Sequence, residues 1–192
     1  MKTLDLHKIR KQLAKHLDAK RYEHTLGVAY TAAALAMRYG ENIYDAELAG
    51  LLHDCAKCID NEKKIQICEK HQIEISDSER KNPFLLHAKV GGYIANKKYD
   101  VKDSNILNAV IYHTTGRPEM SMLEKIVYIA DYIEPGRNTA PNLATIRSLV
   151  FQDLDKALLQ ILEDTLTYLQ KTDKEIDPMT QKTYEYYKGI LL

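Results

Sequence analysis

The sequence predicts an all-α protein, folded as a compact helical bundle of about nine helices that forms one domain over residues 1–192. Apolar residues recur at three- and four-residue steps along most of the chain, which is the spacing of one helix face. No segment shows the convincing two-residue alternation of a half-buried strand. Glycine (8) and proline (5) are scarce, and several of them fall where a helix is expected to begin or end.

The N-terminal part of the chain is expected to form four helices. The first covers residues 5–20 and has a charged outer face, and the second covers about 22–39 and ends at Gly40, a residue suited to a helix C-terminus. Asp45 can cap a third helix, and a short fourth helix follows Asn61. The residues expected to face inward are Leu6, Ile9, Leu13, Leu17, Leu26, Ala29, Ala33, Met37, Leu48, Leu51, Leu52, Cys55, Ile65 and Cys68.

Five further helices are expected from residue 83 onward. Their predicted ranges are 84–99, 103 or 104 to about 116, 121–134, 142–151 and 153–171. Pro83 suits the first turn of the first of these helices, because the N–H that proline lacks has no intrahelical partner there. The last of them has the clearest apolar stripe, with Glu163 outside. Its inward residues are Leu154, Leu158, Ile161, Leu162, Thr165 and Leu169.

Composition and charge exclude several classes of function. The 27 Lys and Arg residues balance the 27 Asp and Glu residues, whereas a non-specific binder of nucleic acid or of an anionic membrane usually has a basic excess. The longest uncharged stretches, 25–37 and 104–116, are too short to cross a bilayer, and residues 1–6 lack the apolar core of a signal peptide. Three cysteines cannot pair evenly and nothing suggests secretion, so we expect a cytoplasmic protein. From the charge balance and the short apolar stretches, we expect that it binds neither nucleic acid nor membranes.

The seven histidines fall into two groups. Those in charged segments, which are expected to be solvated, are His7, His16 and His71. Those in or beside apolar helical segments are His24, His53, His87 and His113. Two aspartates share the apolar setting, because Asp54 directly follows His53 and Asp131 lies within an apolar helix. Burying such a carboxylate alone costs several kcal/mol, so each must have a partner.

Together, these four histidines and two aspartates indicate a metal centre. Any one of them alone would more often be a hydrogen-bonded core residue, but imidazoles and carboxylates share one use in a dry interior, which is to coordinate a hard or borderline cation. Six ligands exceed the need of one tetrahedral zinc and suit two metals about 3.5–4 Å apart. Asp54 is a plausible bridge, since it directly follows one candidate ligand and comes from the middle of the set. The lack of thiolate ligands favours iron, manganese or zinc, and the excess positive charge of two such ions would attract phosphate.

Four longer motifs resemble one family closely. They are Arg21-Tyr22-Glu23-His24-Thr25, His53-Asp54-Cys55-Ala56-Lys57, His113-Thr114-Thr115-Gly116-Arg117 and Ala130-Asp131-Tyr132-Ile133-Glu134-Pro135-Gly136-Arg137. The His…His-Asp…Asp pattern resembles the HD-domain metal-dependent phosphohydrolases, and His87 and His113 resemble their two-metal subset. The longer strings resemble the YqeK-like symmetrical diadenosine tetraphosphate (Ap4A) hydrolases, which are associated with iron. The matches indicate a metal-binding core over about 21–138, with residues 142–192 completing the fold.

The resemblance implies a set of ligands and a reaction. It gives His24, His53, Asp54 and Asp131 to one metal, and Asp54, His87 and His113 to the other. A hydroxide held between the metals would attack a phosphorus of Ap4A, and the products would be two ADP. The residues expected to be catalytic are Asp54, Lys57 and Asp131.

Five residues are expected to bind the substrate: Gly27, Lys57, Thr114, Arg117 and Arg137. Lys57 lies one helical turn after Asp54 and can reach the same pocket, although an exposed lysine would have the same spacing. Arg117 and Arg137 follow glycines near helix ends, where a loop can present a guanidinium to phosphate or simply leave it on the surface. Gly27 could leave room for the nucleotide or for a neighbouring helix.

Other functions remain open on these residues. The site could hydrolyse a nucleoside triphosphate, a monophosphate or a cyclic nucleotide, it could be a di-iron oxygenase, or it could be a non-catalytic nucleotide sensor. The cationic residues favour hydrolysis over oxygen chemistry, and the intact ligand set argues against a sensor. The Tyr-rich segment 176–187 could line a nucleoside pocket, close the core or form a homodimer contact. We interpret the Cys55-to-Cys58 spacing as incidental, because a zinc site would need a second pair.

Overall fold

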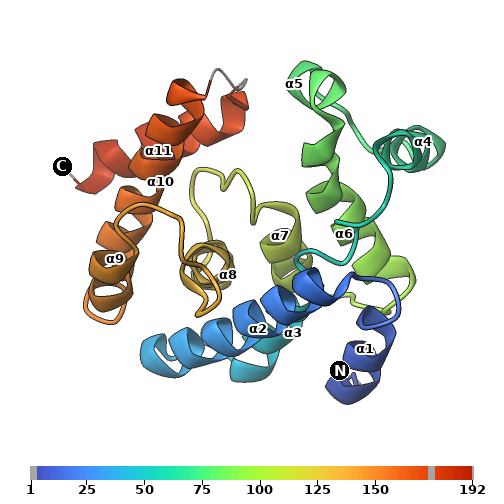
Figure 1. The fold of residues 1–192 in the computed structure, drawn as a ribbon, viewed down its shortest axis with the longest axis horizontal. Helices are drawn as coiled ribbons and strands as arrows, with labels where there is room; N and C mark the ends of the chain where they lie inside the picture. Colours follow the sequence, from blue (N-terminus) through green and yellow to red (C-terminus); the bar gives the residue numbers. More distant parts are fainter. Residues whose placement is uncertain (1–3, 173–175, 192) are drawn as a thin grey trace.

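The structure, a computed structural model, describes residues 4–172 and 176–191, and over these residues it contains helices and no strand (Figure 1). The helices are α1 (Leu6–Leu13), α2 (Ala19–Tyr39), α3 (Ile43–Leu52), α4 (Asn61–Lys70), α5 (Asp77–Lys81), the 3-10 helix η1 (Pro83–Leu86), α6 (His87–Lys97), α7 (Ser104–Ile111), α8 (Met122–Ile133), α9 (Leu143–Leu149), α10 (Leu154–Lys171) and α11 (Pro178–Leu191). The all-α prediction is confirmed, with eleven α-helices in the described residues where about nine were expected. None of these helices combines the length and the hydropathy of a membrane span.

Helices α2, α3, α7 and α8 pack against one another at the centre of the molecule. The group α4–α6 lies on one side of them and the group α9–α11 on the other (Figure 1). The central helices bury apolar side chains completely, among them Leu35, Leu51, Ile126 and Ile129. This arrangement brings the N-terminal part of α2, the residues after α3, the start of α6, the turn after α7 and the last turn of α8 to one place, where the predicted ligands lie.

Several helices begin or end at other residues than expected, because short polar side chains cap them. The helix expected over 5–20 ends at Leu13, since the side chain of Asp18 accepts a hydrogen bond from the backbone N–H of Arg21 and starts α2 at Ala19. Helix α3 is capped by Asn42 rather than by Asp45. The helix expected over 84–99 divides into η1 and α6.

Two helices were not expected. Helix α5 starts with a capping box, in which the side chains of Ser76 and Glu79 each accept from the other's backbone N–H. Helix α11 contains the Tyr-rich segment, and its Tyr187 is buried with the hydroxyl accepting a hydrogen bond from the N–H of Met120 at 2.9 Å. The segment therefore packs onto the core.

The apolar stripe predicted for α2 is confirmed except at its last residue, because Ala29 and Ala33 are buried and Leu26 packs against the core. Met37 was expected to face inward, but it is 64% exposed. The buried face is centred on Val28, Ala32 and Leu35, and Met37 lies about 200° around the helix from Leu35 at 100° per residue. By contrast, the inward positions Leu154, Leu158, Ile161 and Leu162 of α10 are all buried, as expected.

Candidate metal centre

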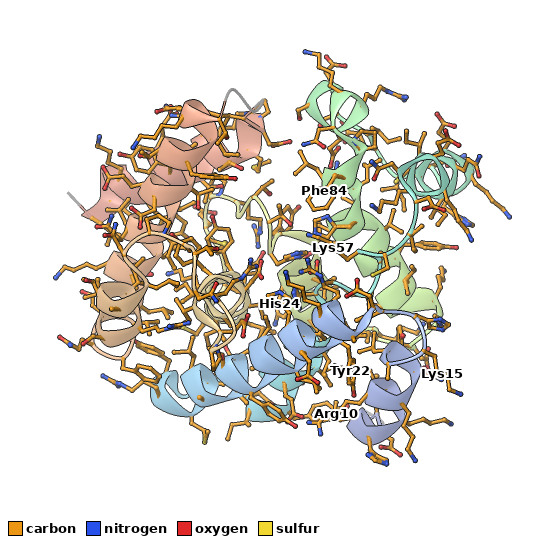
Figure 2. All side chains as sticks on the ribbon, in the orientation of Figure 1. Arg10, Lys15, Tyr22, His24, Lys57 and Phe84 are labelled. Atoms are coloured by element: carbon orange, nitrogen blue, oxygen red, sulfur yellow. The ribbon has the colours of Figure 1, made fainter. Side chains whose placement is uncertain are left out.

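The structure brings the six expected ligands together near the middle of the molecule. Figure 2 labels one of them, His24, close to Lys57. They come from five places in the fold: His24 from α2, His53 and Asp54 from the end of α3, His87 from the start of α6, His113 from the turn after α7, and Asp131 from α8. Two sets of ligand atoms each lie within 4.8 Å of one another. These sets are His24, His53 and Asp131, and His53, Asp54 and His113.

Asp54 lies between two pairs of histidines. Its Oδ2 atom lies 3.5 Å from Nε2 of His53 and 4.0 Å from Nε2 of His24. Its Oδ1 atom lies 3.2 Å from Nε2 of His87 and 3.5 Å from Nε2 of His113. Each carboxylate oxygen therefore faces one pair of imidazoles, which is the arrangement that a carboxylate bridging two cations requires.

Asp131 adds a carboxylate to one pair only. Its Oδ1 atom lies 3.0 Å from Nε2 of His24 and 4.0 Å from Nε2 of His53. The two halves of the cluster are therefore unequal, with two carboxylates near His24 and His53 and one near His87 and His113.

Hydrogen bonds on Nδ1 aim the imidazoles at the cluster. Three of them donate from Nδ1 to the carbonyl oxygen three residues earlier, at 2.6 to 2.7 Å, so each ring is tied to the backbone turn that carries it. The pairs are His53 with Gly50, His87 with Phe84, and His113 with Val110. His24 donates instead to Oε1 of Glu134 at 3.0 Å. In all four neutral imidazoles the proton is therefore on Nδ1, and Nε2 carries the lone pair that can bind a metal.

The cluster leaves buried acceptors that a cation would satisfy. Nε2 of His24, Nε2 of His53 and Oδ1 of Asp54 are buried and have no hydrogen-bond partner. Nε2 of His87 and Nε2 of His113 face each other at 3.2 Å, although both are acceptors. Two ligands about 2.1 Å from one ion lie about 3.0–3.4 Å apart at octahedral or tetrahedral angles. The spacing and the donor set therefore fit divalent cations.

The ionisation of the ligands favours metal binding at neutral pH. Burial opposes the charge of Asp54, but the neighbouring His53, His113 and His87 outweigh it and hold its pKa well below the usual value. The pKa of Asp131 is also held low, because contacts with the imidazoles and with Arg137 outweigh burial. Burial lowers the pKa of His87 to about 4, so this imidazole is neutral.

Lys57 lies inside the cluster. Its ammonium is 2.9 Å from Nε2 of His87 and 3.4 Å from Oδ1 of Asp54, and it lies over the ring of Phe84, 4.3 Å from the ring centroid (Figure 2). Burial lowers the pKa of this lysine, while the two aspartates oppose that shift. The structure therefore places Lys57 in the site and not on an exposed helix face.

Two further expected substrate residues lie at the cluster, and one does not. Nη2 of Arg137 is 2.7 Å from Oδ1 of Asp131, and the hydroxyl of Thr114 is 3.1 Å from Nε2 of His113. Arg117 instead makes two hydrogen bonds to the buried carboxylate of Glu124, at 2.6 and 2.9 Å. Its guanidinium is held by this pair, so the structure gives it no place in the site.

Gly27 is explained by a residue that the sequence interpretation missed. A Cβ atom at Gly27 would lie 2.5 Å from Oε2 of Glu134, so the glycine makes room for this carboxylate, and it also lines a pocket of about 750 Å³ with Arg21 and Arg137. Arg21 was also missed, and its Nη1 donates to Oδ2 of Asp54 at 2.6 Å. Glu134 and Arg21 both lie inside the family motifs, and this membership was the one sign in the sequence that they matter. Their roles depend on neighbours that are distant in sequence, so no local pattern could show them.

A pocket of about 540 Å³ opens beside the cluster. On the cluster side it is lined by Lys57, His113, Thr114, Asp131 and Arg137. The opposite wall comes from α8, α10 and the loop between α8 and α9, and it contains Tyr128, Tyr132, Thr139, Ala140, Pro141, Ile161, Asp164, Thr165 and Tyr168. The pocket therefore joins cations and metal ligands to an aromatic wall.

Comparisons with known proteins agree with this geometry. Residues 21–136 match the HD domain model. The chain is 40% identical over 178 residues to the symmetrical bis(5'-nucleosyl)-tetraphosphatase of Bacillus subtilis, covering 93% of this chain and 92% of the relative. It is 43% identical to the protein of the same name from Halalkalibacterium halodurans, covering 90% of this chain and 92% of the relative.

A solved structure gives the same result. The crystal structure of a predicted HD superfamily hydrolase involved in NAD metabolism from Clostridium acetobutylicum superimposes with a TM-score of 0.94 at 40% identity, over 98% of this chain and 100% of that chain. Sequence and fold thus agree over nearly the whole length. The chain belongs to the HD domain family and, within it, to the family of the symmetrical bis(5'-nucleosyl)-tetraphosphatases.

Proposed function

We propose that this protein hydrolyses Ap4A symmetrically, so that Ap4A and water yield two ADP. The observation that carries this proposal is the pair of histidine sets divided by Asp54, next to a pocket that combines cations with aromatic side chains. The identity of about 40% to symmetrical bis(5'-nucleosyl)-tetraphosphatases over more than 90% of the chain supports the choice of substrate.

The proposed centre holds two divalent metals. His24, His53, Asp54 and Asp131 would hold one, and Asp54, His87 and His113 the other. The nitrogen and oxygen donors suit iron, manganese or zinc, and among these we propose iron. When bound, such a pair of ions supplies Lewis acidity and an activated water molecule.

The protein's own cations would position the tetraphosphate. Lys57 and Arg137 line the pocket on the cluster side, so both can hold phosphate oxygens, Arg137 through two parallel N–H groups. They would hold one of the two inner phosphorus atoms at the cluster. Attack of water there, with the bridging oxygen between the two inner phosphates leaving on the other half, releases two ADP. Thr114, whose hydroxyl lies between the imidazoles and the pocket, would donate a further hydrogen bond.

The aromatic wall of the pocket would hold one nucleoside. Tyr132 and Tyr168 offer ring faces to a base, and Ile161 adds an apolar surface. Asp164, which already accepts from the side-chain amides of Asn142 and Gln160, is fixed at the same wall. The nucleoside site thus comes from α8 and α10, whereas the Tyr-rich segment of α11 packs onto the core.

A product assay tests the proposal. Anaerobically purified protein would be given Ap4A, and nucleotides and bound iron, manganese and zinc would be quantified in the same sample. Two ADP with about two metals per chain would support it. ATP plus AMP would contradict symmetrical attack, and no cleavage of Ap4A by the metal-loaded protein would contradict the choice of substrate and lead to tests of other nucleotides.

A further inference from the structure

The four ligand histidines differ in the group that accepts their Nδ1 proton. His53, His87 and His113 donate to neutral backbone carbonyls. His24 alone donates to a carboxylate, Oε1 of Glu134. An imidazole paired with a carboxylate is a more basic ligand than one paired with a carbonyl, so this difference bears on how strongly each half of the cluster holds a cation.

Among the described residues, the side-chain carboxylate of Glu134 accepts hydrogen bonds from His24 and from one neighbouring backbone N–H. Its residue is only 4% exposed, and its Oε2 atom accepts the backbone N–H of Gly136 at 2.6 Å. Within residues 4–172 and 176–191, no lysine or arginine forms an ion pair with its carboxylate. Arg137 interacts electrostatically with Glu134 without forming an ion pair, and the ring of His24 links the same buried carboxylate to the cluster.

Two glycines make the space for this carboxylate. A Cβ atom at Gly27 would lie 2.5 Å from Oε2 of Glu134, and a Cβ atom at Gly136 would lie 3.0 Å from the same oxygen. Gly27 lies inside α2, where glycine is less favourable than alanine, so its presence there needs a local reason. Two segments distant in sequence are thus shaped around one carboxylate.

The charges on the two sides of Asp54 are unequal. The side of His24 and His53 has Asp131, whose charge Arg137 offsets at 2.7 Å, and in addition Glu134. The side of His87 and His113 has no further carboxylate and has the Lys57 ammonium 2.9 Å from Nε2 of His87. Arg21 and Lys57 each contact a different oxygen of Asp54, so they do not reverse this difference.

We propose that Glu134 is a positioning residue that acts through His24 and makes the His24 side the tighter of two unequal metal positions. The inference rests on the two-metal centre of the proposed function. The position beside Lys57 is the weaker one and exchanges its ion more readily. Binding of the two ions is therefore sequential.

Metal titration of the full-length chain tests this inference without an activity assay. The chain would be stripped of metal and titrated with Mn²⁺, with free Mn²⁺ counted by electron paramagnetic resonance. We expect two classes of site in the wild type. Glu134→Gln keeps the shape and an acceptor for the Nδ1 proton but removes the charge, and we expect the tighter class to weaken by about 10–100-fold while the weaker class is unchanged.

A second variant approaches the same contact from the other side. Gly27→Ala keeps the charge of Glu134 but displaces its carboxylate, and we expect it to weaken the same class. Glu23→Gln is the matched control, because it removes an exposed carboxylate one residue from His24 that has no contact with the cluster. If the Glu134→Gln variant lost its helical circular dichroism signal, it would be unfolded, and the titration of Gly27→Ala would then test the inference.

Three results would overturn the inference. A wild type with two equal sites, a Glu134→Gln variant with an unchanged tight class, or weakening by Glu23→Gln of the same size would each do so. The first two leave the proposed function intact, provided that two ions bind and Ap4A is cleaved. A wild type that binds fewer than two ions overturns both, and the product assay with metal counting identifies that case.

Discussion

Helices α2 and α3 approach each other closely at Gly50, and Gly50→Ala tests what this contact contributes. A Cβ atom there would lie 2.7 Å from Cα and 3.1 Å from N of Ala29, whereas ordinary carbon contacts are about 3.5–4.0 Å. The helices must separate by about 1 Å, because backbone atoms cannot rotate away. Overpacking costs about 1–3 kcal/mol, and we take the upper part, about 2–3 kcal/mol, because the Cβ meets rigid backbone. Replacing a helical glycine by alanine returns about 1 kcal/mol. We expect a net loss of about 1–2 kcal/mol in the free energy of unfolding.

The same separation moves His24, on α2, away from His53, at the end of α3. We therefore expect weaker metal binding together with a melting temperature about 2–8 °C lower, measured by circular dichroism and Mn²⁺ titration. Gly189→Ala is the matched control: its Cβ meets nothing within 4 Å, so it should leave stability unchanged or raise it by up to about 1 kcal/mol. The reasoning would be refuted if Gly50→Ala were as stable as this control.

Three other substitutions test separate parts of the centre. Asp54→Ala should abolish both the binding of two metals and turnover, because it removes the carboxylate that contacts both pairs of histidines. Two metals per chain by elemental analysis would contradict this. Lys57→Ala should leave metal content unchanged and raise KM for Ap4A by about tenfold or more, as one charge-assisted contact is worth about 1.5–3 kcal/mol, and unchanged kinetics would count against it. Arg117→Ala should lower the free energy of unfolding by about 1–3 kcal/mol with kcat retained, because it leaves the buried Glu124 carboxylate underpaired. A stable variant with lost turnover would place Arg117 in the site after all.

The ligands could be predicted from the sequence because their chemistry conflicts with their surroundings. Asp131 lies in an otherwise apolar helix, and His53 and Asp54 follow a run of apolar residues, so each signals a partner without any knowledge of the fold. Helix α10 was predictable for the opposite reason, since the apolar face of its sequence is the face that packs into the core.

The supporting residues could not be predicted in the same way. Glu134 and Arg21 are ordinary charged residues locally, and only the packing of α2 against the end of α8 gives them a role. Arg117 follows a glycine as Arg137 does, but its pairing with Glu124 on the next helix could not be read from that position. Helix α11 was missed because its polar and aromatic residues only acquire an inward face against the rest of the core.

Because three imidazoles donate to carbonyls three residues earlier, the direction of each ring and the distance between rings are controlled by different parts of the structure. The direction of each ring is fixed by its own turn of backbone, whereas the distances between rings are fixed by how the helices pack. A core substitution that shifts one helix by a fraction of an ångström therefore changes the spacing of the donors and leaves their aim intact. We therefore expect core substitutions of graded size to change metal affinity in small steps, because helix packing sets the distances between the donor atoms.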